Sequence, residues 1–227
     1  MGPGALVKRE RNERPQCGRA YLRTKCQFTG IFEKKENPSA ASLTPVRAML
    51  LQLLYNYHAL GEFTSEFAAE KLSYFLQRFG ERQLKLDFLK GFYGPYSGKV
   101  RHILYEVDGY YLKGYEEKDG RPFEPLELTV DKAPAVRQYI LNELSQEERN
   151  RLNKVAELIT GFESPYGLEL LATIDYLIQE NNTFDATIIA EKLWSERKRK
   201  MFSNEHIDTA ISHLLAYRKN LYYMTAE

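Results

Sequence analysis

Residues 44–61 read TPVRAMLLQLLYNYHALG, and this stretch predicts a fold built mainly from helices. Thr44 is a favoured helix N-cap, and Pro45 suits the first helical position because its fixed φ is already helical. Apolar side chains then recur every three or four residues, as on one face of an α-helix. They are Val46, Met49, Leu50, Leu53, Leu54 and Tyr57, and Gly61 is expected to end the helix.

Similar spacing predicts further helices along the chain, at residues 64–79, 99–107, 131–144, 146–162, 165–180, 185–194 and 204–217. Apolar and polar residues alternate at 84–88, which predicts a short strand, and residues 110–115 and 125–130 predict a hairpin. The predicted fold is mainly α with a small antiparallel β-sheet (α+β), and its C-terminal helices, residues 165–217, are helix-turn-helix-like.

The charge divides the chain into two parts. Residues 1–36 contain nine Lys or Arg and four Glu, whereas the remaining 191 residues contain 23 basic and 27 acidic side chains. The basic part has no sustained apolar periodicity, and residues 37–42 are small and polar. We therefore interpret residues 1–43 as a basic flexible leader and residues 44–227 as the folded domain, with room for a sub-division near residue 145.

The composition excludes several classes of protein. With 43% hydrophobic and 28% charged residues, the chain has the balance of a globular protein. No apolar run has the roughly 18 to 20 residues that a membrane helix needs, and the N-terminus lacks the apolar segment of a secretory signal. Two cysteines in 227 residues do not form a disulfide framework, so we expect a reducing, cytoplasmic location without membrane contact.

No motif for catalysis or cofactor binding is complete. The closest match to a phosphate-binding loop, residues 94–99, has its glycines one residue too close together and lacks the Ser or Thr that would hold Mg²⁺. His206 and His213 could share a helix face, but a zinc site needs three or four ligands. We predict no catalytic residue, metal or cofactor, and an enzyme of unrecognised type is the least supported alternative.

Two segments have unusual composition. Residues 88–96, FLKGFYGPY, place four aromatic rings on a turn, where they either fill the core or form an interaction platform. Residues 194–202, WSERKRKMF, place four cations between apolar residues. These cations, Arg197, Lys198, Arg199 and Lys200, suit phosphate contacts in a DNA-binding module, although a solvated loop is the simpler interpretation and the folded part is net acidic.

Four stretches resemble a known family. They are TPVRA at 44–48, KGFYGPY at 90–96 with RHIL at 101–104 and DGY at 108–110, GFESPYGLELLAT at 161–173, and the segment 194–202. Together, and in this order, they resemble the C-terminal domain of DarG antitoxins. The first aromatic block is also similar to the Panacea domains, a broader antitoxin-associated group.

The resemblance implies a partner and a mechanism. DarG-type antitoxins counteract DarT, an NAD-dependent ADP-ribosyltransferase that modifies thymidine in single-stranded DNA. They usually carry an N-terminal macrodomain that removes the ADP-ribose, and their C-terminal domain binds the toxin. Residues 1–43 are too short for a macrodomain, so the resemblance implies the binding half, without glycohydrolase activity, and an upstream macrodomain in the full-length antitoxin.

We therefore predict an antitoxin domain that binds a DarT-type toxin and blocks its single-stranded DNA site. A basic groove with aromatic stacking positions suits DNA, so an acidic, Tyr-rich partner could mimic the nucleic acid. The candidate toxin-binding residues are Tyr93, Tyr96, Tyr110, Tyr111, Glu116, Glu117 and Asp119. The alternative is a transcriptional regulator that binds DNA through Arg197, Lys198, Arg199 and Lys200.

Overall fold

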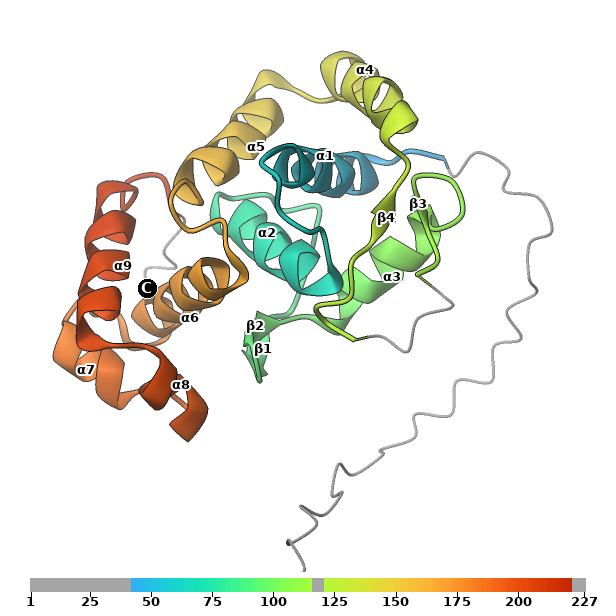
Figure 1. Cartoon of the computed structure of the whole chain (residues 1–227). Coiled ribbons are helices and arrows are strands. Elements are labelled where there is room, and N and C mark those ends of the chain that lie inside the picture. Colours follow the sequence, from blue (N-terminus) through green and yellow to red (C-terminus); the bar gives the residue numbers. More distant parts are fainter. Residues whose placement is uncertain (1–41, 116–120, 222–227) are drawn as a thin grey trace, which may run out of the picture. The chain divides into compact units, whose positions relative to one another are not determined.

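Helices make up most of the computed structural model, which describes residues 42–115 and 121–221 (Figure 1). This confirms the predicted mainly helical class. The helices are α1 (Pro45–Ala59), α2 (Glu66–Arg78), α3 (Gly98–Val107), α4 (Ala133–Glu143), α5 (Gln146–Leu158), α6 (Pro165–Asn181), α7 (Ala186–Glu191), α8 (Glu196–Met201) and α9 (Asn204–Ala216), with a 3₁₀ turn, η1 (Val130–Lys132), before α4.

Helix α1 begins where the sequence predicts. The Thr44 hydroxyl accepts a hydrogen bond from the Arg47 N–H at 3.4 Å, which satisfies one of the free donors of the first turn. The helix is buried on more than its predicted face, since Leu51 and Tyr55 are buried as well. The reason is that α2, α4 and α5 all pack against it, as Figure 1 shows.

Two short antiparallel ladders replace the single small sheet of the sequence prediction. Strand β1 (Leu89–Gly91) pairs with β2 (Gly94–Tyr96), and β3 (Leu112–Lys113) pairs with β4 (Glu127–Leu128). The second ladder confirms the hairpin predicted at 110–130, although its strands are shorter. Its far end is tied to the start of α2, because the Phe67 N–H donates to the Pro122 carbonyl at 2.8 Å.

The strand predicted at residues 84–88 is wrong. The alternation is real, because Leu84 and Leu86 are buried while Lys85 and Asp87 are exposed. However, the backbone of Leu86 pairs with the side-chain amide of Gln77, which donates to its carbonyl and accepts from its N–H, both at 2.8 Å. One side chain thus replaces the neighbouring strand, and the ladder begins only at Leu89.

Helices α2 and α6 are joined by a buried ionic contact. The Asp175 carboxylate, which is fully buried, accepts hydrogen bonds from the Tyr74 hydroxyl at 2.6 Å and from the Arg78 guanidinium at 2.6 and 3.1 Å. Burying a charge is costly unless it is paired and hydrogen-bonded, and both conditions are met here. This contact fixes the two helices against which the β1–β2 hairpin packs.

Some predictions fall on residues outside the described ranges. The leader proposed for residues 1–43 lies outside them except for its last two positions, so the boundary at residue 43 stays a prediction.

Within the described ranges, no helix combines the length and the apolar character needed to span a bilayer. One helix was missed: residues 196–201 form α8, which is capped by the Ser195 hydroxyl accepting from the Lys198 N–H at 3.3 Å.

A candidate binding site at the aromatic hairpin

The turn between β1 and β2 consists of two residues, Phe92 and Tyr93. Gly91 and Gly94 pair across the base of this turn. Gly94 has a φ of +98°, and a Cβ at this position would lie 3.0 Å from the Thr173 hydroxyl of α6. Only glycine therefore allows the hairpin to lie this close to α6 without strain.

Three side chains bind main-chain carbonyls of the hairpin. The contacts are Trp194 Nε1 to the Gly91 carbonyl (3.0 Å), Lys198 Nζ to the Phe92 carbonyl (2.9 Å) and Lys71 Nζ to the Pro95 carbonyl (2.7 Å). One contact falls on β1, one on the turn and one on β2, so both strands and the turn are fixed. Two of the donors are cations, which make stronger hydrogen bonds than neutral groups.

A single carboxylate, that of Glu169, pairs with two of the cations on α8. Glu169 of α6 forms a two-pronged pair with the Arg197 guanidinium, at 2.7 and 3.0 Å, and accepts from Lys198 Nζ at 2.5 Å. Burial alone would raise the pKa of Glu169, but the hydrogen bonds from Arg197 and Lys198 outweigh it and hold the pKa below its usual range. Burial lowers the pKa of Lys198, against the opposing effect of Glu169.

Further charges lie beneath the hairpin on α2. Burial raises the pKa of Glu70, although the Ser97 N–H donates to its carboxylate at 2.8 Å, and burial lowers the pKa of Lys71. One turn earlier, Glu66 accepts from the Tyr115 hydroxyl at 2.8 Å and pairs with Arg101 at 3.2 Å. These contacts fasten the residues that follow the hairpin to α2.

Above this charged base lies a cluster of four aromatic rings, Phe67, Phe92, Tyr93 and Phe123, which we call the aromatic cluster. The Tyr93 ring is central, with centroids 4.7 Å from Phe92, 4.6 Å from Phe123 and 6.3 Å from Phe67. Phe67 is buried, whereas Phe92 and Phe123 are 56% and 42% exposed. The Arg197 guanidinium lies 5.0 Å from the centroids of both Phe92 and Tyr93, within cation–π distance.

Three stretches that are remote in sequence meet at this site. Residues 90–96 supply the hairpin, residues 161–173 supply Glu169 and Thr173, and residues 194–202 supply the donors from α7–α8. They belong to three of the four stretches that carry the resemblance described above. The structure brings together segments that the sequence analysis could only place in order.

The tyrosines predicted to bind a toxin fall into two groups. Tyr93 and Tyr96 lie on the hairpin, and Tyr96 is 40% exposed. Tyr110 is half-buried with Lys132 over its ring at 4.8 Å. Tyr111 is only 5% exposed and belongs to the core, which leaves little of its ring available to a partner. Glu116, Glu117 and Asp119 lie outside the described residues, so their assignment stays a prediction.

The four cations predicted to bind DNA do not form one exposed patch. Lys198 is fully buried, and both it and Arg197 are paired with Glu169. Lys200 is exposed and pairs with Glu196 on its own helix at 2.6 Å, and Arg199 is exposed. Lys198 cannot reach a phosphate while this arrangement persists, so the DNA-binding alternative loses its central residue.

Sequence reasoning missed several residues of the site, among them Phe67, Lys71, Phe123 and Glu169. Lys71 and Glu169 each lie among apolar neighbours on their helices, and a charge within an apolar stretch is the available signal for a buried pair. The partner could not be named, because Glu169 and Lys198 are 29 positions apart. Phe123 had no signal in the sequence beyond being aromatic.

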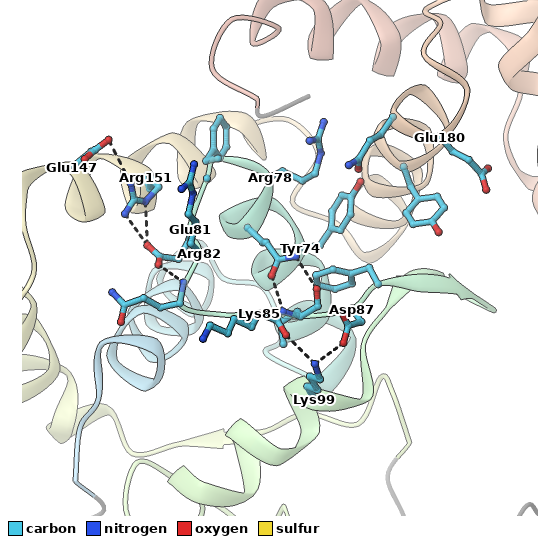
Figure 2. A pocket seen from close by; sticks show the side chains of 18 residues that line it. Tyr74, Arg78, Glu81, Arg82, Lys85, Asp87, Lys99, Glu147, Arg151 and Glu180 are labelled. Carbon is cyan, nitrogen blue, oxygen red and sulfur yellow. Dashed lines mark hydrogen bonds and ion pairs between the residues drawn. The ribbon is translucent and has the colours of Figure 1, made fainter. Parts of the chain in front are cut away.

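A cleft of about 1260 Å³ lies between the end of α2, the loop after it and the ends of α5 and α6 (Figure 2). Figure 2 shows two groups of paired charges in this cleft: Arg151 with Glu81 and Glu147, and Lys99 with Asp87. We place the candidate site at the hairpin instead, because three of the stretches that carry the resemblance meet there.

The histidines do not assemble a metal site in the described part of the chain. His206 Nδ1 lies 2.6 Å from the Tyr166 hydroxyl, and His213 Nε2 lies 2.7 Å from the Leu158 carbonyl. Across residues 42–115 and 121–221, no three His, Cys, Asp or Glu side chains gather as metal ligands would.

The fold and the site define a helical domain that presents a firmly held, partly exposed aromatic hairpin, which is the kind of feature found at protein-binding surfaces. The chain is homologous over most of its length to the DNA ADP-ribosyl glycohydrolases, the DarG proteins. It is 34% identical to that of Thermus aquaticus over 196 residues, which cover 82% of this chain and 53% of the relative.

The mycobacterial relatives give the same result. The proteins of this name from Mycobacterium tuberculosis and Mycobacterium bovis are each 30% identical over 156 residues, which cover 66% of this chain and 44% of theirs. The chain therefore spans about half the length of the curated relatives it matches. No protein-family model matches it.

Proposed function

We propose that this chain is a toxin-binding antitoxin domain of the DarG type, which neutralises a DarT-type DNA ADP-ribosyltransferase by direct contact. The aromatic cluster docks on the toxin and denies single-stranded DNA its site. The glycohydrolase activity for which the relatives are named is assigned to a macrodomain outside the matched region, and this domain contributes binding rather than catalysis.

The observation that carries the proposal is the exposure of Phe92 on a hairpin that is held at three carbonyls. Phe92 lies beside a second partly exposed ring of the aromatic cluster, Phe123, and rigid aromatic anchors near the centre of an interface supply much of its binding energy. Because the hairpin is already ordered, it loses little further conformational entropy when a partner binds.

Charge supports a nucleic-acid-binding enzyme as the partner. Residues 37–227 carry four more acidic than basic side chains, which complements the basic groove expected of a protein that binds single-stranded DNA. The rings of Phe92 and Tyr96 can take the place of stacked bases. Glu116, Glu117 and Asp119, which precede Phe123 in the chain, are proposed to take the place of phosphates.

The test is co-expression with a DarT-type toxin, followed by size-exclusion chromatography and an assay of DNA ADP-ribosylation. We expect a stable complex and loss of modification at equimolar antitoxin. Competition by excess single-stranded oligonucleotide reports whether the DNA site is the surface covered. If the folded toxin elutes alone and the chain instead binds DNA in a salt-dependent manner, the regulator alternative replaces the proposal.

A further inference from the structure

Glu169 binds two cations that both contact the exposed turn. Through Lys198 it holds the donor that binds the Phe92 carbonyl, and through Arg197 it holds the guanidinium that lies over the Phe92 ring. The carboxylate itself is buried and touches neither the ring nor the surface. Every contact of Glu169 with a cation therefore bears on the orientation of the same aromatic residue.

We propose that Glu169 is the positioning residue of the binding surface: it orients Phe92 for the partner by holding Arg197 at its ring and Lys198 at its main-chain carbonyl. This inference rests on the proposed function for its effect on toxin binding. Its structural part, the orientation of the hairpin, can be measured without the toxin.

Stability alone does not explain this arrangement. A buried ion pair contributes little net stability compared with apolar residues of similar size, because the desolvation of both charges opposes their attraction. Orientation is what the pair supplies, since a guanidinium bound by both carboxylate oxygens has only one plane available to it. The guanidinium held in this way lies 5.0 Å from the ring centroids of both Phe92 and Tyr93.

The substitution Glu169→Gln isolates this role because it changes little in size. A glutamine offers one oxygen acceptor and one NH₂ donor in place of two acceptors. An oxygen in the place of Oε1 can still accept from Lys198 Nζ and Arg197 Nη1, but the NH₂ group takes the place of Oε2 and faces the Arg197 Nη2 donor. The two-pronged pair is lost while the volume of the buried side chain is kept.

The chain offers a matched control and a built-in probe. Glu81 is also a buried glutamate paired with an arginine, Arg151, at 3.0 Å, and it lies in the cleft of Figure 2 rather than at the hairpin. Glu81→Gln is therefore the same chemical change at another site. Trp194, the single tryptophan of the chain, donates to the Gly91 carbonyl and has Lys198 Nζ 5.1 Å from its ring, so its fluorescence reports on the contacts between α8 and the hairpin.

The experiment measures dissociation of the complex with the full chain and the Trp194 emission of the free chain. We expect Glu169→Gln to speed dissociation about tenfold and to shift the emission to longer wavelength, because affinity changes within one interface act mainly on dissociation. Glu81→Gln should alter neither. An unchanged dissociation rate for Glu169→Gln, or equal effects of the two variants, overturns the inference.

Two further outcomes remain decisive. If Glu169→Gln does not fold, Arg197→Ala removes the guanidinium from the rings while the pair of Glu169 with Lys198 remains, and an unchanged dissociation rate overturns the inference. Arg197→Lys should restore binding only in part, because an ammonium cannot form the two-pronged pair. If the unaltered chain does not bind the toxin, the proposed function fails, while an unchanged Trp194 emission in Glu169→Gln would still overturn the structural part of the inference.

Discussion

Replacing Phe92 by alanine should weaken toxin binding strongly while leaving the fold intact. A phenylalanine presents about 200 Å² of surface, and 56% of Phe92 is exposed, so about 110 Å² is available for a partner to cover. At about 25 cal/mol per Å² this corresponds to about 2.8 kcal/mol. Because about 1.4 kcal/mol is tenfold in affinity, the dissociation constant should rise about 100-fold.

The loss should come from the ring alone, since the contact from Lys198 goes to the Phe92 main-chain carbonyl and survives the substitution. Titration calorimetry or surface-immobilised toxin would measure the affinity, with circular dichroism to confirm the fold. Leu141→Ala is the control, because Leu141 is 57% exposed but lies on α4, which packs against α1 rather than the hairpin. If Phe92→Ala changes the affinity by no more than about twofold, the placement of the interface is refuted, because this change is far smaller than the one expected from the exposed area.

The remaining predictions concern stability. Asp175→Asn should lower the free energy of unfolding in urea by about 3 to 5 kcal/mol, because it leaves the Arg78 guanidinium buried without its anion; a loss below about 1 kcal/mol would contradict this. Burial raises the pKa of Glu70 to about 8, so the folded chain keeps a proton that the unfolded chain releases. The free energy of unfolding should therefore fall as the pH rises from about 4.5 towards 8. Urea titrations across that range should show a smaller fall for Glu70→Gln, and the same fall in both chains would argue against this role of Glu70. Gly167→Ala should reduce the melting temperature, because its Cβ would lie 2.7 Å from main-chain atoms of Phe162. Gly98→Ala is the control, since the nearest atom to its Cβ would be 3.8 Å away. Equal melting temperatures of the two variants would count against tight packing at Gly167.

Local signals predicted most of the helices. The caps at Thr44, Ser145 and Ser164 each accept from a main-chain N–H within their own first turn, so the residues that define the helix start lie three positions apart. Alternation at residues 84–88 gave the correct burial but the wrong element, because the partner was the Gln77 side chain rather than a strand. Periodicity reports which side chains are buried, and does not report what the main chain pairs with.

The candidate site was predicted only in part. Its aromatic residues Tyr93 and Tyr96 stood out by composition, but Tyr111 stood out equally and is buried. The cations at 197–200 suggested phosphate binding because a sequence shows charge without showing its partner. Glu169 neutralises two of them from another helix, which turns an apparent basic patch into an internal support.

The sequence alone determined the mainly helical class and the turn at residues 91–94, because caps, periodicity and glycines act over a few neighbouring residues. Only the tertiary structure decided which residues face a partner. Lys71, Glu169 and the segment with Trp194 and Lys198 come from three places in the chain and converge on one hairpin. That convergence depends on how the helices pack, since the energy of a buried charge is set by the groups that packing places around it.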